Sequence, residues 1–425
     1  MRILIAAGHV IDPSQAIDGV FDILIKGRKI EGIYPKGKAP KGEIDRVIDA
    51  RGMYVLPGLV DMHTHLREPG FEHKETIKTG TLAAIKAGFT SVCAMPNTMP
   101  VNDSAGITEY ILQKAEEEGA CAVFPIGAIT KGQAGEELTD MDTMRNAGCV
   151  AFSDDGFPVE KSLLMRRALE YSKACGVPLI AHSEDLSLSA GGMMNEGLLS
   201  QTLGLGGIPN TAEETAVFRD IALSELTGAR LHIAHVSTEG SVRIIRAAKS
   251  RGVKVTAETC PHYFSITEEA VKGYNTNAKV NPPLRTERDV KAIKEGLRDG
   301  AIDVIATDHA PHSKGDKMKE FDLAPSGISG LETALGLSLR LVDEGVLTLT
   351  ELIRKMTVNP ATILSLNKGG LKPGSDADAA IIDLKKSFNV DINQFESKGK
   401  NTPFDWWLLK GAVVVTVAGG KVHRW

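Results

Sequence analysis

Residues 53–65 read MYVLPGLVDMHTH, an apolar run that ends in His63, Thr64 and His65. Side chains two positions apart on a β-strand project to the same side, so His63 and His65 can offer imidazole nitrogens to one metal ion at the strand's carboxyl end. Residues 66–70 (LREPG) then add a cation and a turn. Two histidines packed under a loop would leave the same local pattern, so the rest of the chain has to decide.

Composition predicts an ordinary globular protein with a sizeable core. The chain has 425 residues, 42% of them hydrophobic and 24% charged, and its net charge is −5. Lysine and arginine are scattered, which argues against nucleic acid as a partner. The amino-terminal MRILIAAGH is too short for a signal sequence and no run approaches a membrane span, so we expect a cytoplasmic protein without membrane contact. The five cysteines form no CxxC pair, which predicts buried free thiols.

Residues 1–56 and 366–425 both consist of short strand patterns separated by glycine turns. Examples are VFDILIKGRKIEGIYP at 20–35 and KGAVVVTVAGGKV at 410–422. Neither half alone offers many strands to close a core. We therefore predict one small β-sandwich domain assembled from both termini.

The intervening residues 57–365 alternate apolar strand candidates with helical patterns. Eight strands are predicted near 59–63, 91–95, 122–127, 150–153, 178–182, 230–235, 254–258 and 303–307. Helices are predicted at 73–87, 161–174, 212–227, 241–249 and 329–342, among others. Eight βα units favour a TIM-like (β/α)8 barrel, which gathers its chemistry at the carboxyl ends of the strands. A doubly wound sheet usually carries a glycine-rich phosphate loop, and no such sequence follows a strand here.

Candidate metal ligands stand at five of these strand ends. They are His63 and His65, the pair Asp154 and Asp155, His182, His235 and Asp308. Taken singly, Asp155 or Asp308 could merely cap a helix or turn. Nitrogen and carboxylate donors without cysteine suit Zn²⁺ in an open catalytic site, and the surplus of donors suggests two ions sharing a carboxylate. Such a site would supply a nucleophilic hydroxide for hydrolysis.

Six motifs carry a resemblance across essentially the whole chain. They are HTHLREPG at 63–70, MPNT at 95–98, AFSDDG at 151–156, HIAHVS at 232–237, NPPLR at 281–285 and ATDHAPH at 306–312. Together they resemble the dihydroorotases of the longer bacterial type, within the amidohydrolase superfamily. The resemblance implies reversible cyclisation of N-carbamoyl-L-aspartate to L-dihydroorotate in pyrimidine synthesis.

The resemblance also implies roles. His63, His65, Asp155, His182 and His235 match metal-ligand positions. Asp308 matches the residue that takes a proton from the metal-bound hydroxide and returns it to the departing ring nitrogen, and it could also touch the metal.

For the substrate, the resemblance implies that Arg67 holds the carboxylate of dihydroorotate through parallel charge-assisted bonds. Asn97 and His312 match positions that assist Arg67, and Asn281 matches one near the ring amide. A surface ion pair for Arg67, a turn role for Asn97 and a solvated loop position for His312 are the ordinary alternatives.

One departure concerns the fourth strand, where many binuclear relatives in the superfamily carry a bridging carbamylated lysine. This strand reads CVAFSDD at 149–155 and has no lysine, so Asp155 would have to bridge. Adjacent strand residues point oppositely, so only one of Asp154 and Asp155 should face the centre, and the family match selects Asp155. Residues 313–323 (SKGDKMKEFDL) would form either a mobile lid or a solvated connection.

Two alternatives stay open at this point. A hydantoinase, dihydropyrimidinase or allantoinase would use the same barrel on another cyclic amide, although Arg67, Asn97 and His312 argue for a carboxylate-bearing substrate. A non-catalytic dihydroorotase-like partner of aspartate transcarbamoylase would not need the intact ligand set. We also expect a homo-oligomer, and association with aspartate transcarbamoylase is left open.

Overall fold

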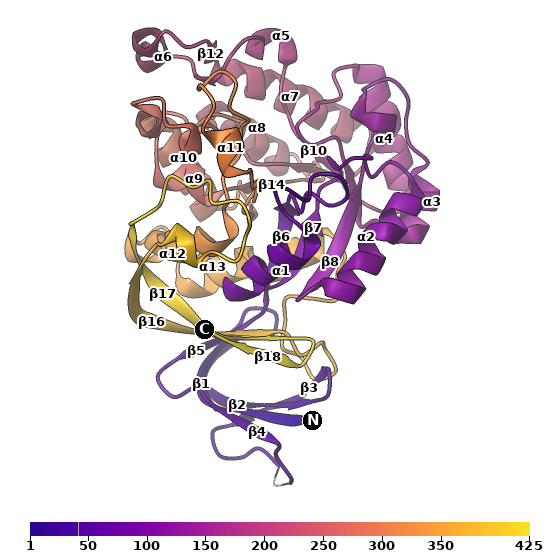
Figure 1. Cartoon of the computed structure of the whole chain (residues 1–425). Coiled ribbons are helices and arrows are strands. Elements are labelled where there is room, and N and C mark those ends of the chain that lie inside the picture. The colour runs from indigo at the N-terminus through magenta and orange to yellow at the C-terminus, as the bar shows by residue number, and fades with distance from the viewer. Residues whose placement is uncertain (41) are drawn as a thin grey trace.

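A computed structural model describes residues 1–40 and 42–425, and it places a barrel above a smaller sheet (Figure 1). Eight strands form the smaller sheet: β1 (Arg2–Asp12), β2 (Ile17–Lys26), β3 (Lys29–Pro35), β4 (Arg46–Asp49), β5 (Tyr54–Pro57), β16 (Ala379–Asn389), β17 (Leu408–Ala418) and β18 (Lys421–Arg424). The antiparallel pairing of β5 with β16 joins the two terminal segments. Isoleucines from both halves, such as Ile5, Ile23 and Ile381, share one buried cluster. The expectation that both termini build one β-domain is confirmed, and boundaries near residues 56 and 366 stay a prediction.

The second eight-stranded sheet is the barrel, and its paired strands are parallel. Its strands are β6 (Leu59–Thr64), β7 (Phe89–Ala94), β8 (Ala122–Gly127), β9 (Ala151–Ser153), β10 (Leu179–Ala181), β13 (Leu231–Ile233), β14 (Val255–Thr259) and β15 (Val304–Ile305). They follow one another around the barrel in chain order. An isolated parallel bridge between Thr64 and His309 brings the last strand back to the first. All eight predicted strands, and with them the (β/α)8 class, are confirmed.

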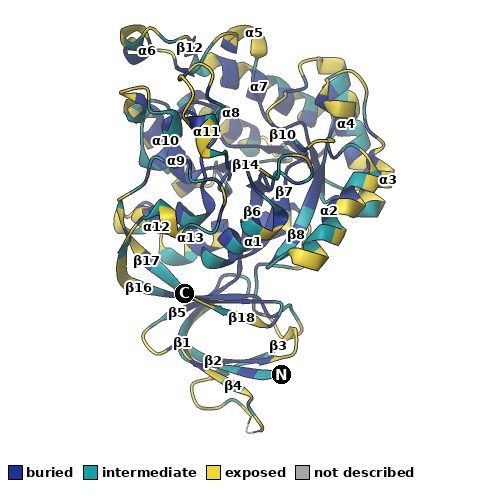
Figure 2. Cartoon of the chain, viewed as in Figure 1, coloured by how far each residue is buried: buried dark blue, intermediate teal, exposed yellow. Residues whose placement is uncertain are grey.

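Helices surround this sheet and present their exposed faces outward (Figure 2). The longer ones are α1 (Ile77–Lys86), α2 (Ala105–Glu118), α3 (Met141–Ala147), α4 (Ser162–Cys175), α7 (Asn210–Thr227), α8 (Glu239–Ser250), α10 (Glu287–Asp299), α12 (Leu331–Asp343) and α13 (Leu349–Lys355). Shorter helices are α5 (Leu186–Ser189), α6 (Leu198–Leu203), α9 (Pro261–Ser265), α11 (Lys314–Lys317) and α14 (Val358–Ile363), and a two-stranded sheet joins β11 (Met194–Asn195) to β12 (Gly207–Ile208). The five predicted helices are present. The first begins later than predicted, because Thr76 caps it by accepting the N–H of Thr79 at 3.1 Å.

Two apolar clusters hold the barrel together. One lies between strands and helices and includes Phe89 and Phe152, which are fully buried. The other draws mainly on the strands, with Met62, Ile126 and Ile180 among its members, and so fills the barrel interior. All five cysteines are free and buried, as the sequence predicts. Within the described residues, every helix is too short or too polar to cross a bilayer.

Candidate functional site

The predicted residues meet at the carboxyl end of the barrel. Each lies in or shortly after a strand: His63 in β6, His65 just beyond it, Asp155 after β9, His182 after β10, His235 after β13 and Asp308 after β15. All six side chains are buried. The carboxyl ends of all the barrel strands meet at one end of the barrel, and this explains why residues up to 245 positions apart lie close together.

Five of these side chains form two groups that share one carboxylate. His63, His65 and Asp155 make the first group, and Asp155, His182 and His235 make the second, with candidate donor atoms in each group within 4.8 Å of one another. Asp155 Oδ1 lies 3.3 Å from Nε2 of both His63 and His235, and Oδ2 lies 3.4 Å from Nε2 of His65. The ring centroids of His63 and His235 are 5.3 Å apart. Asp155 occupies the bridging position between the two groups.

Its neighbour Asp154 points elsewhere. Asp154 Oδ1 accepts the backbone N–H groups of Ile129 and Thr130 at 2.8 and 3.1 Å, and Oδ2 accepts the Thr130 hydroxyl. Asp154 therefore secures the chain that follows β8. The two adjacent carboxylates have separate tasks, as alternation along a strand requires.

Asp308 faces the first group from the opposite end of the sheet. Its Oδ1 lies 3.1 Å from Nε2 of His65 and 3.5 Å from Nε2 of His63. The backbone φ angles of Asp308 and His235 are +46° and +35°, in the left-handed region that residues other than glycine seldom adopt. Such strain persists only where the surroundings enforce it, and it is common at functional sites.

Three polar side chains outside the cluster orient its histidines. Glu258 accepts from Nδ1 of His63 at 2.6 Å. Glu184 lies 2.9 Å from Nε2 of His182. Asn97 Oδ1 lies 2.8 Å from Nδ1 of His65. These contacts fix which nitrogen of His63 and His65 faces the cluster, as carboxylate and carbonyl partners do at metal sites.

The electrostatics of the cluster suit a cation. Burial lowers the pKa of His63, but Asp155 and Glu258 outweigh burial and raise that pKa well above its usual value. Burial likewise lowers the pKa of His182, yet bonds to Asp155 and Glu184 raise it to about 10. The carboxylates thus stabilise positive charge at the imidazoles.

The donor atoms themselves support the same conclusion. Among the described residues, the buried Nε2 of His63 lies 3.3 Å from Asp155 Oδ1 but makes no hydrogen bond of normal geometry. A buried polar atom without a partner is costly unless something absent from the chain satisfies it. Imidazole nitrogen and carboxylate oxygen are suitable donors for a divalent transition-metal ion, so the residues fit a metal site.

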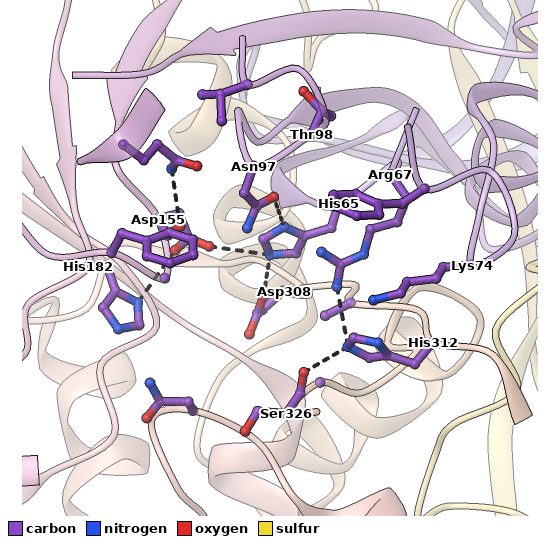
Figure 3. A pocket seen from close by; sticks show the side chains of 18 of the residues that line it. His65, Arg67, Lys74, Asn97, Thr98, Asp155, His182, Asp308, His312 and Ser326 are labelled. Atoms are coloured by element: carbon purple, nitrogen blue, oxygen red, sulfur yellow. Dashed lines mark hydrogen bonds and ion pairs between the residues drawn. The ribbon is translucent and has the colours of Figure 1, made fainter. Parts of the chain in front are cut away.

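A cavity of about 550 Å³ opens above the cluster (Figure 3). Arg67 and Lys74 are among its lining residues. The Arg67 guanidinium donates from Nε to the carbonyl of Pro311 at 3.3 Å, and burial lowers its pKa to about 10. In residues 1–40 and 42–425, no carboxylate lies within the 4.0 Å ion-pair distance of this guanidinium. Arg67 is therefore free to bind an anion in the cavity, and the alternative of a surface ion pair is not what the structure has.

His312 and Asn97 stand on either side of this cation in Figure 3. His312 Nε2 donates to the carbonyl of Ser326 at 2.9 Å and lies 3.5 Å from Nη2 of Arg67. Burial, and then the charge of Arg67, lower the pKa of His312 to about 2, so its ring is neutral near pH 7. Asn97 Oδ1 accepts from Nδ1 of His65, so the Asn97 Nδ2 group can donate to another acceptor.

Asn281 also lines the cavity. Its Nδ2 donates to Glu184 Oε2 at 3.0 Å, the same oxygen that contacts His182. Asn281 therefore belongs to the network that orients the second metal group, and its carbonyl oxygen stays available.

Residues 313–323 are tied down rather than loose. They contain α11, whose Lys317 is buried and donates to the carbonyls of Thr276 and Pro325 at 2.9 and 2.8 Å. Lys279 donates in turn to the carbonyls of Phe321 and Asp322 at 2.6 and 3.1 Å. Two lysines thus fasten this segment to the chain beside it.

Three residues at the site were not predicted from the sequence: Glu258, Glu184 and Lys74. Glu258 lies near the carboxyl end of a predicted strand, and that position could have marked it as a candidate. Glu184 follows His182 by two residues. Lys74 falls within a predicted helix, where a charge looks like an ordinary solvated face.

Known proteins resemble this chain along almost its whole length. Residues 52–241 match the family model described as dihydro-orotase-like. A dihydroorotase of Geobacter metallireducens is 58% identical over 422 residues, 99% of each chain. A dihydroorotase of Syntrophus aciditrophicus is 55% identical over 423 residues, again 99% of each chain.

Solved structures share the fold. The L-hydantoinase (dihydropyrimidinase) of Arthrobacter aurescens superposes with a TM-score of 0.89 at 27% identity, covering 99% of this chain and 95% of that one. A D-hydantoinase of a Thermus species gives 0.84 at 26% identity, covering 99% and 94%.

Proposed function

The chain belongs to the dihydroorotase family, and we propose that its barrel cavity interconverts N-carbamoyl-L-aspartate and L-dihydroorotate in pyrimidine synthesis. One observation carries this: two histidine groups share Asp155 at the floor of a cavity whose wall presents Arg67, which has no carboxylate partner in the part of the chain that the structure describes. A hydrolytic centre and an anion-binding group thus face the same space, as opening a ring that bears a carboxylate requires.

We propose zinc as the metal. His63, His65 and Asp155 would hold one ion, and Asp155, His182 and His235 would hold a second. A bound zinc ion supplies Lewis acidity and lowers the pKa of a coordinated water to about 7. The donors are nitrogen and oxygen alone, which suits zinc in a catalytic rather than a structural site.

Asp308 is positioned to carry the proton. It lines the cavity, and neighbouring histidines, above all His63, overcome the effect of burial and lower its pKa below the usual range, so it is ionised at neutral pH. It would accept a proton from the attacking water and return it to the ring nitrogen as the carbon–nitrogen bond breaks. The reverse reaction uses the same group in the opposite order.

Arg67 would bind the substrate carboxylate through two parallel bonds, which hold the ring in one orientation. Asn97 Nδ2 would donate to the same carboxylate, and the one N–H of the neutral His312 ring, on Nε2, would be shared between the Ser326 carbonyl and the carboxylate to complete this carboxylate clamp. Asn281 would face the ring amide. Lys74 adds a second positive charge to the same wall.

The hydantoinase alternative rests on the fold, which those enzymes share at about a quarter sequence identity. Fold alone does not assign a substrate. The free Arg67 favours dihydroorotate over hydantoin or allantoin, which lack a carboxylate in that place. A homo-oligomeric state, a cytoplasmic location and association with aspartate transcarbamoylase stay predictions.

Turnover of dihydroorotate, hydantoin and allantoin by the purified protein tests the proposal. We expect turnover of dihydroorotate, its loss on chelation and its return with zinc. Equal activity of the metal-stripped protein, or a preference for hydantoin, would contradict it.

A further inference from the structure

Between β16 and β17 the chain leaves the lower sheet and runs past α12 toward the catalytic end of the barrel (Figure 1). Residues 396–402 form the part that reaches the site, and we call them the 396–402 segment. Glu332 of α12 accepts the N–H groups of Glu396 and Ser397 at 2.9 and 3.3 Å. Glu75, just before α1, accepts the N–H of Lys398 at 3.2 Å. The segment is therefore anchored to α12 and to the residue that precedes the N-cap of α1.

Asn401 is the residue of this segment that meets the catalytic loops. Its side chain is buried and uses its full hydrogen-bonding capacity. Oδ1 accepts the backbone N–H of His312 at 2.8 Å and the Ser329 hydroxyl at 2.9 Å. Nδ2 donates to the carbonyls of Ala310 and Gly327 at 3.0 and 2.9 Å. One amide thus joins two loops that lie 72 to 91 residues from it in sequence.

Both loops belong to the carboxylate clamp. The first contains His312 and also Pro311, whose carbonyl accepts from Arg67 Nε. The second contains Ser326, whose carbonyl accepts from the His312 ring. Asn401 itself is not among the residues that line the cavity. Any effect of Asn401 on substrate must therefore pass through these loops.

The segment also approaches the first loop too closely for an ordinary side chain. A Cβ at Gly399 would lie 2.4 Å from Pro311 Cβ. The Ser329 hydroxyl also lies 2.9 Å from the carbonyl of Gly399. Backbone contact at Gly399 and the amide at Asn401 thus hold the same loop from adjacent points.

We propose that Asn401 is a positioning residue for substrate specificity: it fixes the loops that carry His312 and the Pro311 carbonyl, and so sets the geometry in which Arg67 and His312 receive the substrate carboxylate. The inference rests on the proposed function. It gives the C-terminal part of the chain a role in substrate binding at the barrel.

Steady-state kinetics of Asn401→Ala with dihydroorotate test this. Because the clamp binds the carboxylate and the metal groups lie elsewhere, KM should rise on the order of 10- to 100-fold while kcat falls less than about 3-fold. Zinc content should match the wild type. Asn401→Asp should behave like Asn401→Ala, since it keeps an acceptor for His312 but sets an oxygen against the carbonyls of Ala310 and Gly327.

Asn393→Ala provides the matched control, because Asn393 is exposed and lies in the same excursion between β16 and β17. It should leave KM unchanged. If Asn401→Ala does not fold, Ser329→Ala tests the proposal instead. This variant removes only the hydroxyl that lies between Gly399 and Asn401, and it should raise KM by roughly 3-fold or more. An unchanged KM in the folded variant, or a fall in kcat accompanied by loss of zinc, would overturn the proposal. A wild type that does not turn over dihydroorotate would instead contradict the proposed function.

Discussion

Glu258 and His63 are 195 residues apart, yet the Glu258 carboxylate accepts from Nδ1 of His63 at 2.6 Å, with both side chains buried. The other oxygen of Glu258 lies 3.2 Å from Nε2 of His232. Because Glu258 holds the proton on Nδ1, Nε2 is the nitrogen of His63 that would give up its proton and bind a metal ion, and the carboxylate makes that nitrogen a stronger ligand.

Glu258→Gln should therefore weaken metal binding, because the neutral amide keeps the shape of the side chain but removes its charge. We expect zinc affinity to fall about 10- to 100-fold, measured by competition with a chromogenic chelator. Glu225→Gln, at an exposed position of α7, is the control. Affinity within about twofold of the wild type would show that Glu258 does not tune the site.

Arg67→Lys tests the carboxylate clamp. Lysine keeps the charge but cannot make two parallel bonds to one carboxylate. Loss of one charge-assisted bond costs about 1.5–3 kcal/mol, so KM for dihydroorotate should rise roughly 10- to 100-fold with a smaller change in kcat. The exposed Arg51→Lys should leave both constants as they are. A variant that loses kcat at constant KM would place Arg67 in the chemical step instead.

Lys317→Met tests whether the Lys317 side chain holds residues 313–323 against the neighbouring chain. Burial lowers the pKa of Lys317 to about 7. Its Nζ donates to the carbonyls of Thr276 and Pro325, which lie outside the segment. Methionine fills similar space but leaves those carbonyls without donors. Amide hydrogen exchange across 314–323 should accelerate on the order of 10-fold or more. The exposed Lys319→Met is the control, and unchanged exchange in Lys317→Met would show that other contacts hold the segment.

The barrel and its ligand-bearing strand ends could be predicted because each rests on a local signal. An apolar run followed by His63, His182 or His235 is visible within a few residues, and parallel strands bring such ends together. Contacts between side chains leave no such trace. The sequence around Glu258 does not indicate its contact with His63. The sequence around Asn401 does not indicate its contact with His312, 89 residues away. The start of α1 was misplaced for a related reason: residues 73–76 fit a helical pattern, but the Thr76 hydroxyl caps the helix there.

Lys355 gives a prediction for stability rather than for activity. This last residue of α13 is buried, and its Nζ donates to the carbonyl of Ile302 at 2.7 Å. Burial lowers its pKa from 10.5 to about 8. Below pH 8 the ammonium is charged in both states, and folding carries the full cost of burying it. Between pH 8 and 10.5 the unfolded chain binds the proton that the folded chain has released, so stability rises with pH in this window.

Lys355→Met has no such titration, and the difference between variant and wild type should therefore depend on pH. Each pH unit within the window corresponds to about 1.4 kcal/mol, so from pH 7 to pH 9.5 the free energy of unfolding should shift by ~2 kcal/mol in favour of the wild type. Urea denaturation of both proteins at the two pH values measures this shift. Lys372→Met, at an exposed position that carries no burial cost, is the control. If the difference in the free energy of unfolding between the variant and the wild type is the same at both pH values, the Lys355 ammonium is solvated in the folded protein.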